Sequence, residues 1–377
     1  MYFKEQRFEK AKASTFASTH TVELPDTGLL DSMSLFFRAT NHSDPTAYAP
    51  SNLHHHITKI EVIGNTDKTL FSLTGECALA KAYRKIGALP PFKQQEYGNV
   101  SQDLLIPIFF GRRFKDGQYA LDLSKWDKVE LKVTNDFTTS MLTAASLSME
   151  TRLVTIEDSS QTYAKFLKQW EYQADKPDAD ADYVRPKLPS SGFLRSLMIQ
   201  LDPDLTATTS AVAQDPAGDS YNWKLWFKDR ALTVRDHRPR DLMRDEHLRL
   251  GIGHSSCKPY QSITRNTDFH WAEVIAIAAV ADKQSAAAGT PPTFGGSRDR
   301  YQCPVAVGTC DDYQALIQGI GLFHTFEIPW FTTDMEAEYL NLDQYKPIEI
   351  EWYGYKDDHT HRIILEKPIG QGSNEFA

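Results

Sequence analysis

Cysteine is scarce in this sequence. The 377 residues contain Cys77, Cys257, Cys303 and Cys310, and no two of them form a C-x-x-C motif. This spacing excludes a disulfide-rich scaffold and a zinc ribbon. It predicts reduced thiols in a protein synthesised in the cytoplasm. Cys303 and Cys310 lie close together in the sequence, so a disulfide between these two remains an alternative.

Long apolar runs, an excess of basic residues and the common catalytic motifs are also lacking. No run approaches the roughly 20 apolar residues of a membrane-spanning helix. Lys and Arg number 41 against 50 Asp and Glu, a formal charge of −9, so we expect no general or sequence-specific binding of nucleic acid. The sequence has no G-x-S-x-G elbow, P-loop, Rossmann glycine fingerprint or H-E-x-x-H motif, which argues against the enzyme classes built on them.

Two stretches of the sequence occur twice in the same order. LPDTGLLDS at residues 24–32 matches LPSSGFLRS at residues 188–196, at an offset of 164. Further on, LDLSKWDKVELKV at residues 121–133 matches LNLDQYKPIEIEW at residues 340–352, and an I-P-x-F segment precedes each copy. Because the matches are collinear, they predict a tandem duplication.

Strand-like alternation of apolar and charged residues dominates both copies, for example at residues 129–133 and 348–352. Short helices are expected over residues 76–86 and 240–250, at the same place in each copy. Many short strands with turn signals, in two units of roughly 150 residues, predict a β-sandwich or jelly roll for each unit.

Two more helices are predicted outside the matched segments. Residues 160–173 place Tyr163, Phe166, Leu167 and Trp170 at i, i+3, i+4 and i+7. Residues 270–283 give the second helix. The first would connect the two copies, and the second would lie in an insertion that only the second copy carries.

These observations divide the chain into five parts. The insertion in the second roll should project from it, because extra length in one copy must avoid the shared core. The expected parts are an N-terminal arm at 1–14, a first jelly roll at 15–157, a helix and linker at 158–182, a second jelly roll at 183–370 with the insertion at about 253–318, and a C-terminal tail at 371–377.

Because it carries the repeated LP-x-x-G-x-L-x-S and I-P-x-F segments, the sequence resembles the double-jelly-roll major capsid proteins of tailless icosahedral viruses. That lineage includes membrane-containing phages and adenovirus-like viruses. The resemblance covers about residues 20–366 and concerns architecture, because these proteins share almost no diagnostic motif. It implies an all-β fold of two tandem eight-stranded jelly rolls, with a linker helix and a long loop insertion in the second roll.

The resemblance also implies a function and partners. The chain would be a structural, non-enzymatic protein of the virion, synthesised in the host cytoplasm and without a cofactor. It would form pseudo-hexagonal homotrimers that contact neighbouring capsomers in an icosahedral shell. Minor capsid or penton proteins are further expected partners, and residues 1–14 could reach an internal viral membrane.

One short histidine pattern in the sequence is similar to a known metal-binding motif. His54-x-His56-x4-Glu61 matches the first metal-binding motif of the cupins, which are also jelly rolls. The flanking glycines and the second cupin motif are missing, and His359-x-His361-x4-Glu366 repeats the pattern at a non-equivalent place. We therefore expect ordinary histidines, no metal site and no catalytic residues, with His54, His56 and Glu61 as the metal candidates to test.

Two alternative functions remain open. A double-jelly-roll hydrolase acting on glycans would show acidic and aromatic residues in a cleft between the rolls. A lectin or receptor-binding spike would show an exposed aromatic patch without extensive lateral packing.

Overall fold

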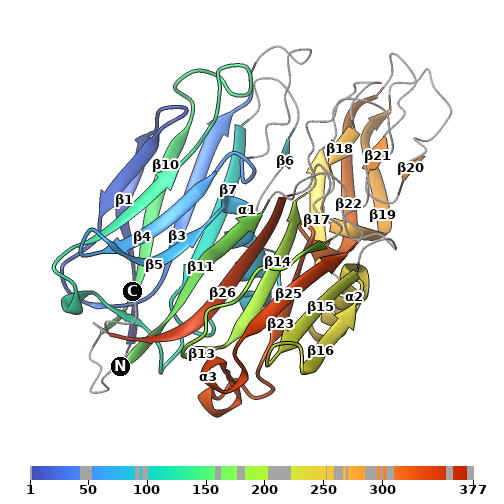
Figure 1. The fold of residues 1–377 in the computed structure, drawn as a ribbon. Helices are drawn as coiled ribbons and strands as arrows, with labels where there is room; N and C mark the ends of the chain where they lie inside the picture. The colour runs from blue at the N-terminus through green and yellow to red at the C-terminus, as the bar shows by residue number, and fades with distance from the viewer. Residues whose placement is uncertain are drawn as a thin grey trace.

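Two β-sandwiches stand side by side in the computed structural model of the chain (Figure 1). The structure describes residues 2–42, 53–89, 94–95, 101–157, 163–175, 183–202, 222–251, 253–258, 266–268, 271–284, 295–297, 300–302, 310–353 and 360–371. Within these ranges, no helix has the length and apolar character needed to cross a membrane.

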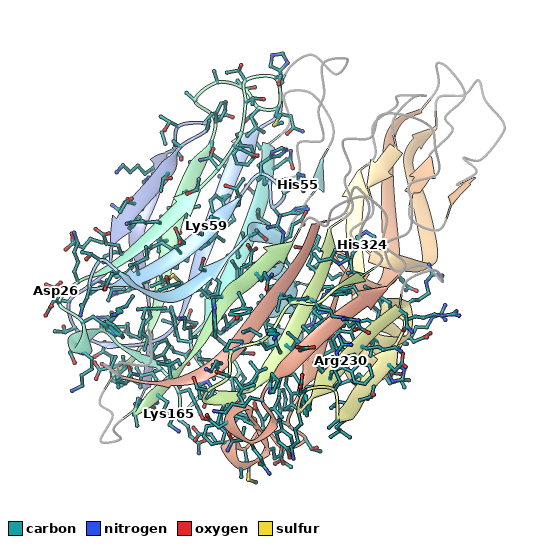
Figure 2. The ribbon with its side chains drawn as sticks, in the orientation of Figure 1. Asp26, His55, Lys59, Lys165, Arg230 and His324 are labelled. Atoms are coloured by element: carbon teal, nitrogen blue, oxygen red, sulfur yellow. The ribbon has the colours of Figure 1, made fainter. Side chains whose placement is uncertain are left out.

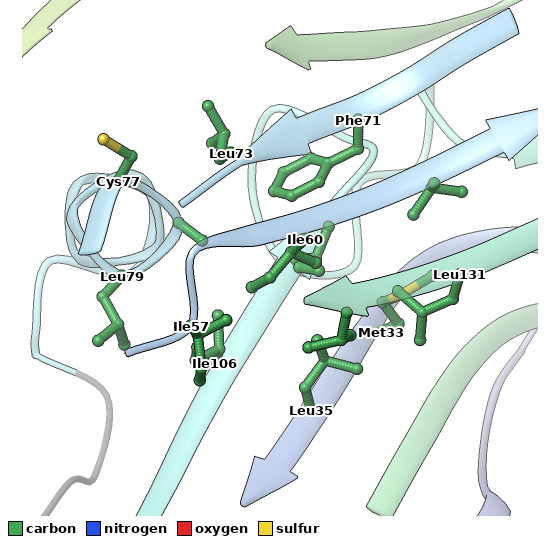
Figure 3. Close-up of a cluster of buried hydrophobic side chains, with 14 of the residues drawn as sticks. Met33, Leu35, Ile57, Ile60, Phe71, Leu73, Cys77, Leu79, Ile106 and Leu131 are labelled. Carbon is green, nitrogen blue, oxygen red and sulfur yellow. The ribbon is translucent and has the colours of Figure 1, made fainter. Parts of the chain in front are cut away.

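The first jelly roll has two sheets, with strand orders β1-β10-β3-β7, where β8 also pairs with β3, and β2-β9-β4-β5. Figure 3 shows that side chains of both sheets meet helix α1 in one hydrophobic cluster. The elements are β1 (Tyr2–Ala13), β2 (Thr19–Glu23), β3 (Leu29–Thr40), β4 (Lys59–Gly64), β5 (Lys68–Leu73), α1 (Gly75–Ile86), β6 (Gln94–Gln95), β7 (Ser101–Phe109), β8 (Leu121–Asp122), the 3-10 helix η1 (Leu123–Lys125), β9 (Val129–Thr134) and β10 (Ser148–Glu157).

The second jelly roll repeats this plan, with strand orders β11-β26-β14-β23 and β12-β25-β15-β16 and a short pair, β13-β24. Its elements are β11 (Lys165–Asp175), β12 (Tyr183–Val184), β13 (Phe193–Leu194), β14 (Ser196–Asp202), β15 (Asn222–Phe227), β16 (Leu232–His237), α2 (Pro239–Leu250), β23 (Thr325–Pro329), η2 (Glu336–Glu338), β24 (Leu340–Asn341), α3 (Leu342–Tyr345), β25 (Ile348–Tyr353) and β26 (Thr360–Gly370).

Matching backbone contacts confirm the duplication. The N–H of Leu123 donates to the carbonyl of Gly28 at 2.9 Å, and the N–H of Leu342 donates to the carbonyl of Gly192 at 2.9 Å. Both glycines have positive φ, +120° and +81°, which a residue with a side chain rarely adopts. The LP-x-x-G segment therefore forms the same turn in each roll, and the predicted helices at 76–86 and 240–250 are α1 and α2.

The register of the I-P-x-F segments corrects one sequence match. Met33 pairs with Ile108, whereas its counterpart Leu197 pairs with Ile328. The structural equivalent of Ile328 is thus Ile108 and not Ile106. A proline shared by chance placed the sequence alignment two residues out of register.

The predicted helix at 160–173 is wrong, because residues 165–175 form strand β11. Phe166 and Leu167 are consecutive and both fully buried, since β11 is covered on both faces. Consecutive buried positions can mimic helical spacing. Strand β11 pairs in parallel with β5 and antiparallel with β26, so one eight-stranded sheet, β2-β9-β4-β5-β11-β26-β14-β23, runs through both rolls.

The predicted helix at 270–283 is also wrong, because residues 271–283 lie in strand β19 (Trp271–Gln284). Most of the insertion forms two small sheets, β19-β22-β17-β6 and β18-β21-β20, which rise beyond the second roll in Figure 1. The remaining strands are β17 (Gly253–Lys258), β18 (Asn266–Asp268), β20 (Gly295–Ser297), β21 (Arg300–Gln302) and β22 (Cys310–Leu322). Cys303 lies outside the described residues.

The N-terminal segment is not a separate arm. Strand β1 pairs with β10 from Tyr2 to Ala13, which makes these residues an edge strand of the first roll. The other proposed boundaries stay predictions, since residues 176–182 and 372–377 lie outside the described part of the chain.

The burial of β11 predicts that Phe166→Ala destabilises the chain by about 3–5 kcal/mol, the usual cost of deleting a buried phenylalanine. Tyr172 on the same strand is 38% exposed, so Tyr172→Ala is the matched control and should stay within about 0.5 kcal/mol of wild type. Chemical denaturation measures both. Equal effects would contradict the placement of β11.

Candidate functional site: the joint between the two jelly rolls

Helix α1 of the first roll supplies the charges at the joint. The Thr74 side chain accepts from the N–H of Cys77 at 3.2 Å to cap its first turn, and Gly87 ends the helix in a left-handed conformation. Arg84 and Lys85 in its last turn suit the negative end of the helix dipole. The capped helix thereby presents a fixed row of cations towards the second roll.

Lys81 is the central cation, and it is 2% exposed. Its ammonium group donates to Glu327 Oε1 at 2.5 Å, to Ser196 Oγ at 2.9 Å and to Glu366 Oε2 at 3.2 Å. All three acceptors belong to β23, β14 and β26 of the second roll. The three protons of the ammonium group therefore all bind the neighbouring roll.

Glu366 is surrounded by further cations. Lys85 Nζ lies 2.7 Å from its Oε1, and Arg195 Nη1 donates to its Oε2 at 2.8 Å. Arg195 also binds Asp334 with two hydrogen bonds, at 2.8 and 2.9 Å. Because Glu366 is fully buried, these partners replace the water that a carboxylate needs.

A second group of charges connects α1 to α2. Arg84 donates to both oxygens of Glu246, each at 2.7 Å, the two-pronged geometry that gives arginine–carboxylate pairs their strength. Arg249 lies 3.2 Å from Glu246 and 3.6 Å from Glu327. We call the whole set the joint cluster; it comprises Lys81, Arg84, Lys85, Arg195, Arg249, Glu246, Glu327, Asp334 and Glu366.

The cluster keeps its central acids ionised. Burial alone would raise the pKa of Glu327, but Lys81 and Arg84 outweigh it and lower that pKa to about 2. In Glu366 the same opposition between burial and the nearby cations Lys81 and Lys85 leaves the pKa well below its ordinary value. The joint thus carries fixed opposite charges on its two sides, in surroundings where they attract strongly.

The metal candidates do not come together. His54 and His56 lie in a turn before β4 and not on a strand, where residues two apart would share one face. The His54 ring packs 4.9 Å from that of Phe323, His56 pairs with Asp136 at 2.8 Å, and Glu61 pairs with Lys59 at 2.8 Å. No group of three possible metal ligands occurs among the described residues.

A hollow of about 550 Å³ opens at the base of the joint, near Lys165 in Figure 2. Its lining includes Tyr119, Tyr163, Arg112 and Glu336. Lys165 lies 2.6 Å from Glu336, the single carboxylate among the described lining residues. Glycoside hydrolysis ordinarily needs a pair of carboxylates, so this hollow does not match the hydrolase alternative.

Sequence reasoning missed the joint cluster. Glu366 entered it only as part of a chance histidine pattern, and Lys81, Arg195 and Glu327 were not singled out. One signal was present in the sequence: Lys81 falls among the buried Ala78, Leu79 and Ala82 of α1, on the apolar side of the helix.

Comparisons with known proteins identify the fold. No protein-family model matches the chain, and no curated protein is similar to it in sequence. Among solved structures, the major capsid protein of Sulfolobus turreted icosahedral virus matches with a TM-score of 0.58 at 10% identity, covering 97% of this chain and 96% of that one. The chain has the double-jelly-roll fold.

Two further structures share it. The major capsid protein P2 of bacteriophage PM2 matches with a TM-score of 0.54 at 9% identity, over 99% of both chains. VP54 of PBCV-1 matches with a TM-score of 0.54 at 9% identity, over 97% of this chain and 94% of that one. These end-to-end matches show that the predicted fold class is right, although its linker is a strand.

Lys81→Met should destabilise the chain by about 3–5 kcal/mol, because it leaves buried carboxylates without their central cation. Lys128 offers a matched control: it lies 3.2 Å from Glu23 and 2.9 Å from Glu130, but on the surface. Lys128→Met should be indistinguishable from wild type in chemical denaturation. A Lys81→Met variant as stable as Lys128→Met would show that the joint cluster contributes nothing.

Acid should weaken the joint. In the unfolded chain Glu327 titrates near its ordinary pKa of 4.5, against about 2 in the fold. The unfolded state therefore binds more protons between these values, and the stability that Glu327 contributes is lost as the pH falls from about 4.5 to 2.

Thermal unfolding at pH 6, 4 and 3 measures this loss. The melting temperature of wild type should fall more steeply with acid than that of Glu327→Gln, which cannot titrate at this position. Burial and the nearby charge of Glu327 both raise the pKa of Glu246, so Glu327→Gln also removes one cause of that shift, and the comparison measures the two carboxylates together. Parallel profiles would be the contrary result.

Proposed function

We propose that this chain is the major capsid protein of a tailless icosahedral virus. The observation that carries the proposal is the pair of pseudo-equivalent jelly rolls, joined by one continuous sheet and by the joint cluster. The solved structures that match this plan from end to end include the major capsid proteins of two viruses and a third protein fitted into a reconstruction of the virophage Sputnik. A block of two similar rolls is suited to tiling, since each chain supplies two similar units to a closed ring.

The working unit is a homotrimer whose six jelly rolls form a pseudo-hexagonal tile. The tile contacts neighbouring capsomers and minor capsid or penton proteins in the virion, after synthesis in the host cytoplasm. Its insertion, residues 253–318, faces outwards. Contact of residues 1–14 with an internal membrane stays a prediction, and it would involve edge strand β1 and not a free arm, because residues 2–13 form that strand.

The structure gives the alternatives no matching support. A hydrolase would leave paired carboxylates open to substrate, whereas Glu327 and Glu366 at the joint are 9% and 0% exposed and bonded to cations. A receptor-binding spike would not need two rolls joined by buried charges.

The mass of the purified chain in solution tests the proposal. Light scattering should give three times the 42.7 kDa of the chain, and negative-stain images should show six-sided particles. Because a chain of net charge −9 repels its copies, trimers and larger arrays should be favoured by about 0.15 M salt over low salt. A stable monomer at every salt and protein concentration would contradict the proposal.

A further inference from the structure

Strands β5 and β11 join the two rolls within one chain. They pair in parallel, with Phe71 opposite Gln169 and Ser72 opposite Trp170. Strand β5 ends the second sheet of the first roll, and β11 begins the first sheet of the second roll. This internal contact is a template for a contact between copies, because each of its strands has a counterpart elsewhere in the chain.

Those counterparts lie at the two ends of the molecule. Strand β1 occupies the place of β11 in the first roll, and β16 occupies the place of β5 in the second. Each stands at an end of its sheet, with β1 on the left and β16 on the lower right in Figure 1. Tyr2 on β1 is 55% exposed and Leu232 on β16 is 49% exposed. Exposed strand edges are templates for pairing with another chain.

The registers fix which residue of β1 corresponds to which residue of β11. The row across three strands is Ser32, Val154, Glu5 in the first roll and Ser196, Glu366, Gln169 in the second. Glu5 is therefore the counterpart of Gln169, and Gln6 is the counterpart of Trp170.

The same comparison applies to β5 and β16. The row is Val133, Ile60, Leu73 in the first roll and Trp352, Trp223, His237 in the second. Two residues before Leu73 and His237 lie Phe71 and Arg235, so Arg235 is the counterpart of Phe71. Asp236 likewise corresponds to Ser72.

We propose that β1 of a second copy of this chain pairs in parallel with β16, with Glu5 opposite Arg235 and Gln6 opposite Asp236. Glu5 and Arg235 are exposed in the single chain and opposite in charge, so their alignment is favourable. Phe71 and Gln169 face each other within the chain. In the proposed contact between chains, their counterparts Arg235 and Glu5 form an ion pair.

The helices support the same contact. Gly87 and Gly251 end α1 and α2, so Leu248 corresponds to Arg84. The Arg84 side chain is 3% exposed at the joint within the chain, whereas Leu248 is 85% exposed. The proposed contact would place a second copy over Leu248, as the joint within the chain covers Arg84.

The contact is head to tail, since it uses different surfaces on the two copies. Joints within chains and joints between chains then alternate around a ring. That the ring closes at three copies rests on the proposed function, whereas the strand pairing itself rests on the internal contact.

Engineered cysteines test the pairing and its register. In the double variant Gln6→Cys with Asp236→Cys, oxidation of the assembled protein should give covalent dimers and trimers on a non-reducing gel. The control Gln6→Cys with Leu232→Cys is displaced by four residues, roughly 13 Å along the strand, and should not cross-link. The single variants measure the background from the native cysteines.

Charge exchange provides a second test. Glu5→Arg and Arg235→Glu should each raise the protein concentration at half-assembly by about tenfold, because like charges then meet. Together the two changes should bring it back to within about threefold of wild type. Both variants alter exposed residues, so the monomer should keep its melting temperature.

The outcomes separate this inference from the proposed function. Suppose that trimers form normally, but that the Gln6→Cys with Asp236→Cys variant gives no cross-link above the single variants and the double charge exchange gives no rescue. That result would overturn the β1–β16 contact and leave the capsid function standing. A chain that stays monomeric in every variant would overturn both. Cross-linking together with rescue would establish the contact.

Discussion

The buried positive charge of Lys81 is the constraint on which the arrangement of the two rolls depends. An ammonium group that is 2% exposed must have all its hydrogen bonds satisfied, and here every acceptor lies on the second roll. These bonds hold helix α1 against β14, β23 and β26. Strand β11 fixes the same geometry through the backbone, because it belongs to the sheet that is continuous through both rolls.

The two copies of the repeat have diverged where their environments differ. The position of Arg195 in the joint corresponds to Asp31 in the first roll, which accepts from the backbone N–H groups of Lys115 and Asp116 at 3.1 and 3.0 Å. Arg84 likewise corresponds to Leu248. The joint within the chain forms as the chain folds, so no folded monomer exposes one side of it with its charges unpaired. The corresponding surface between copies must stay in water until assembly, and it carries the exposed residues Glu5, Arg235 and Leu248 in place of a buried cluster.

The sequence was informative about the fold because duplication multiplies weak signals. Gly28 and Gly192 occupy left-handed positions that few residues tolerate, and their repetition in order revealed two copies of one plan. The predicted helix at 160–173 was wrong for a physical reason. Strand β11 is buried on both faces at Phe166 and Leu167, so its apolar residues lose the alternation that marks a half-buried strand.

The joint cluster could not be predicted in the same way. Lys81 is separated from Glu327 and Glu366 by more than 200 residues, and only the packing of one roll against the other brings them together. Charge alone does not distinguish them from the many solvated lysines and glutamates of the chain. Their burial is a property of the tertiary fold. The local sequence signals it only through the place of Lys81 on the apolar side of its helix.

A cryo-electron microscopy map of the assembled protein, at a resolution that shows side chains, tests the central claim most directly. We predict a ring of six jelly rolls from three chains, with Lys81 enclosed between Glu327 and Glu366 at the joint within each chain. A map in which the two rolls of one chain separate, or in which the chains do not form a closed ring, would contradict the account.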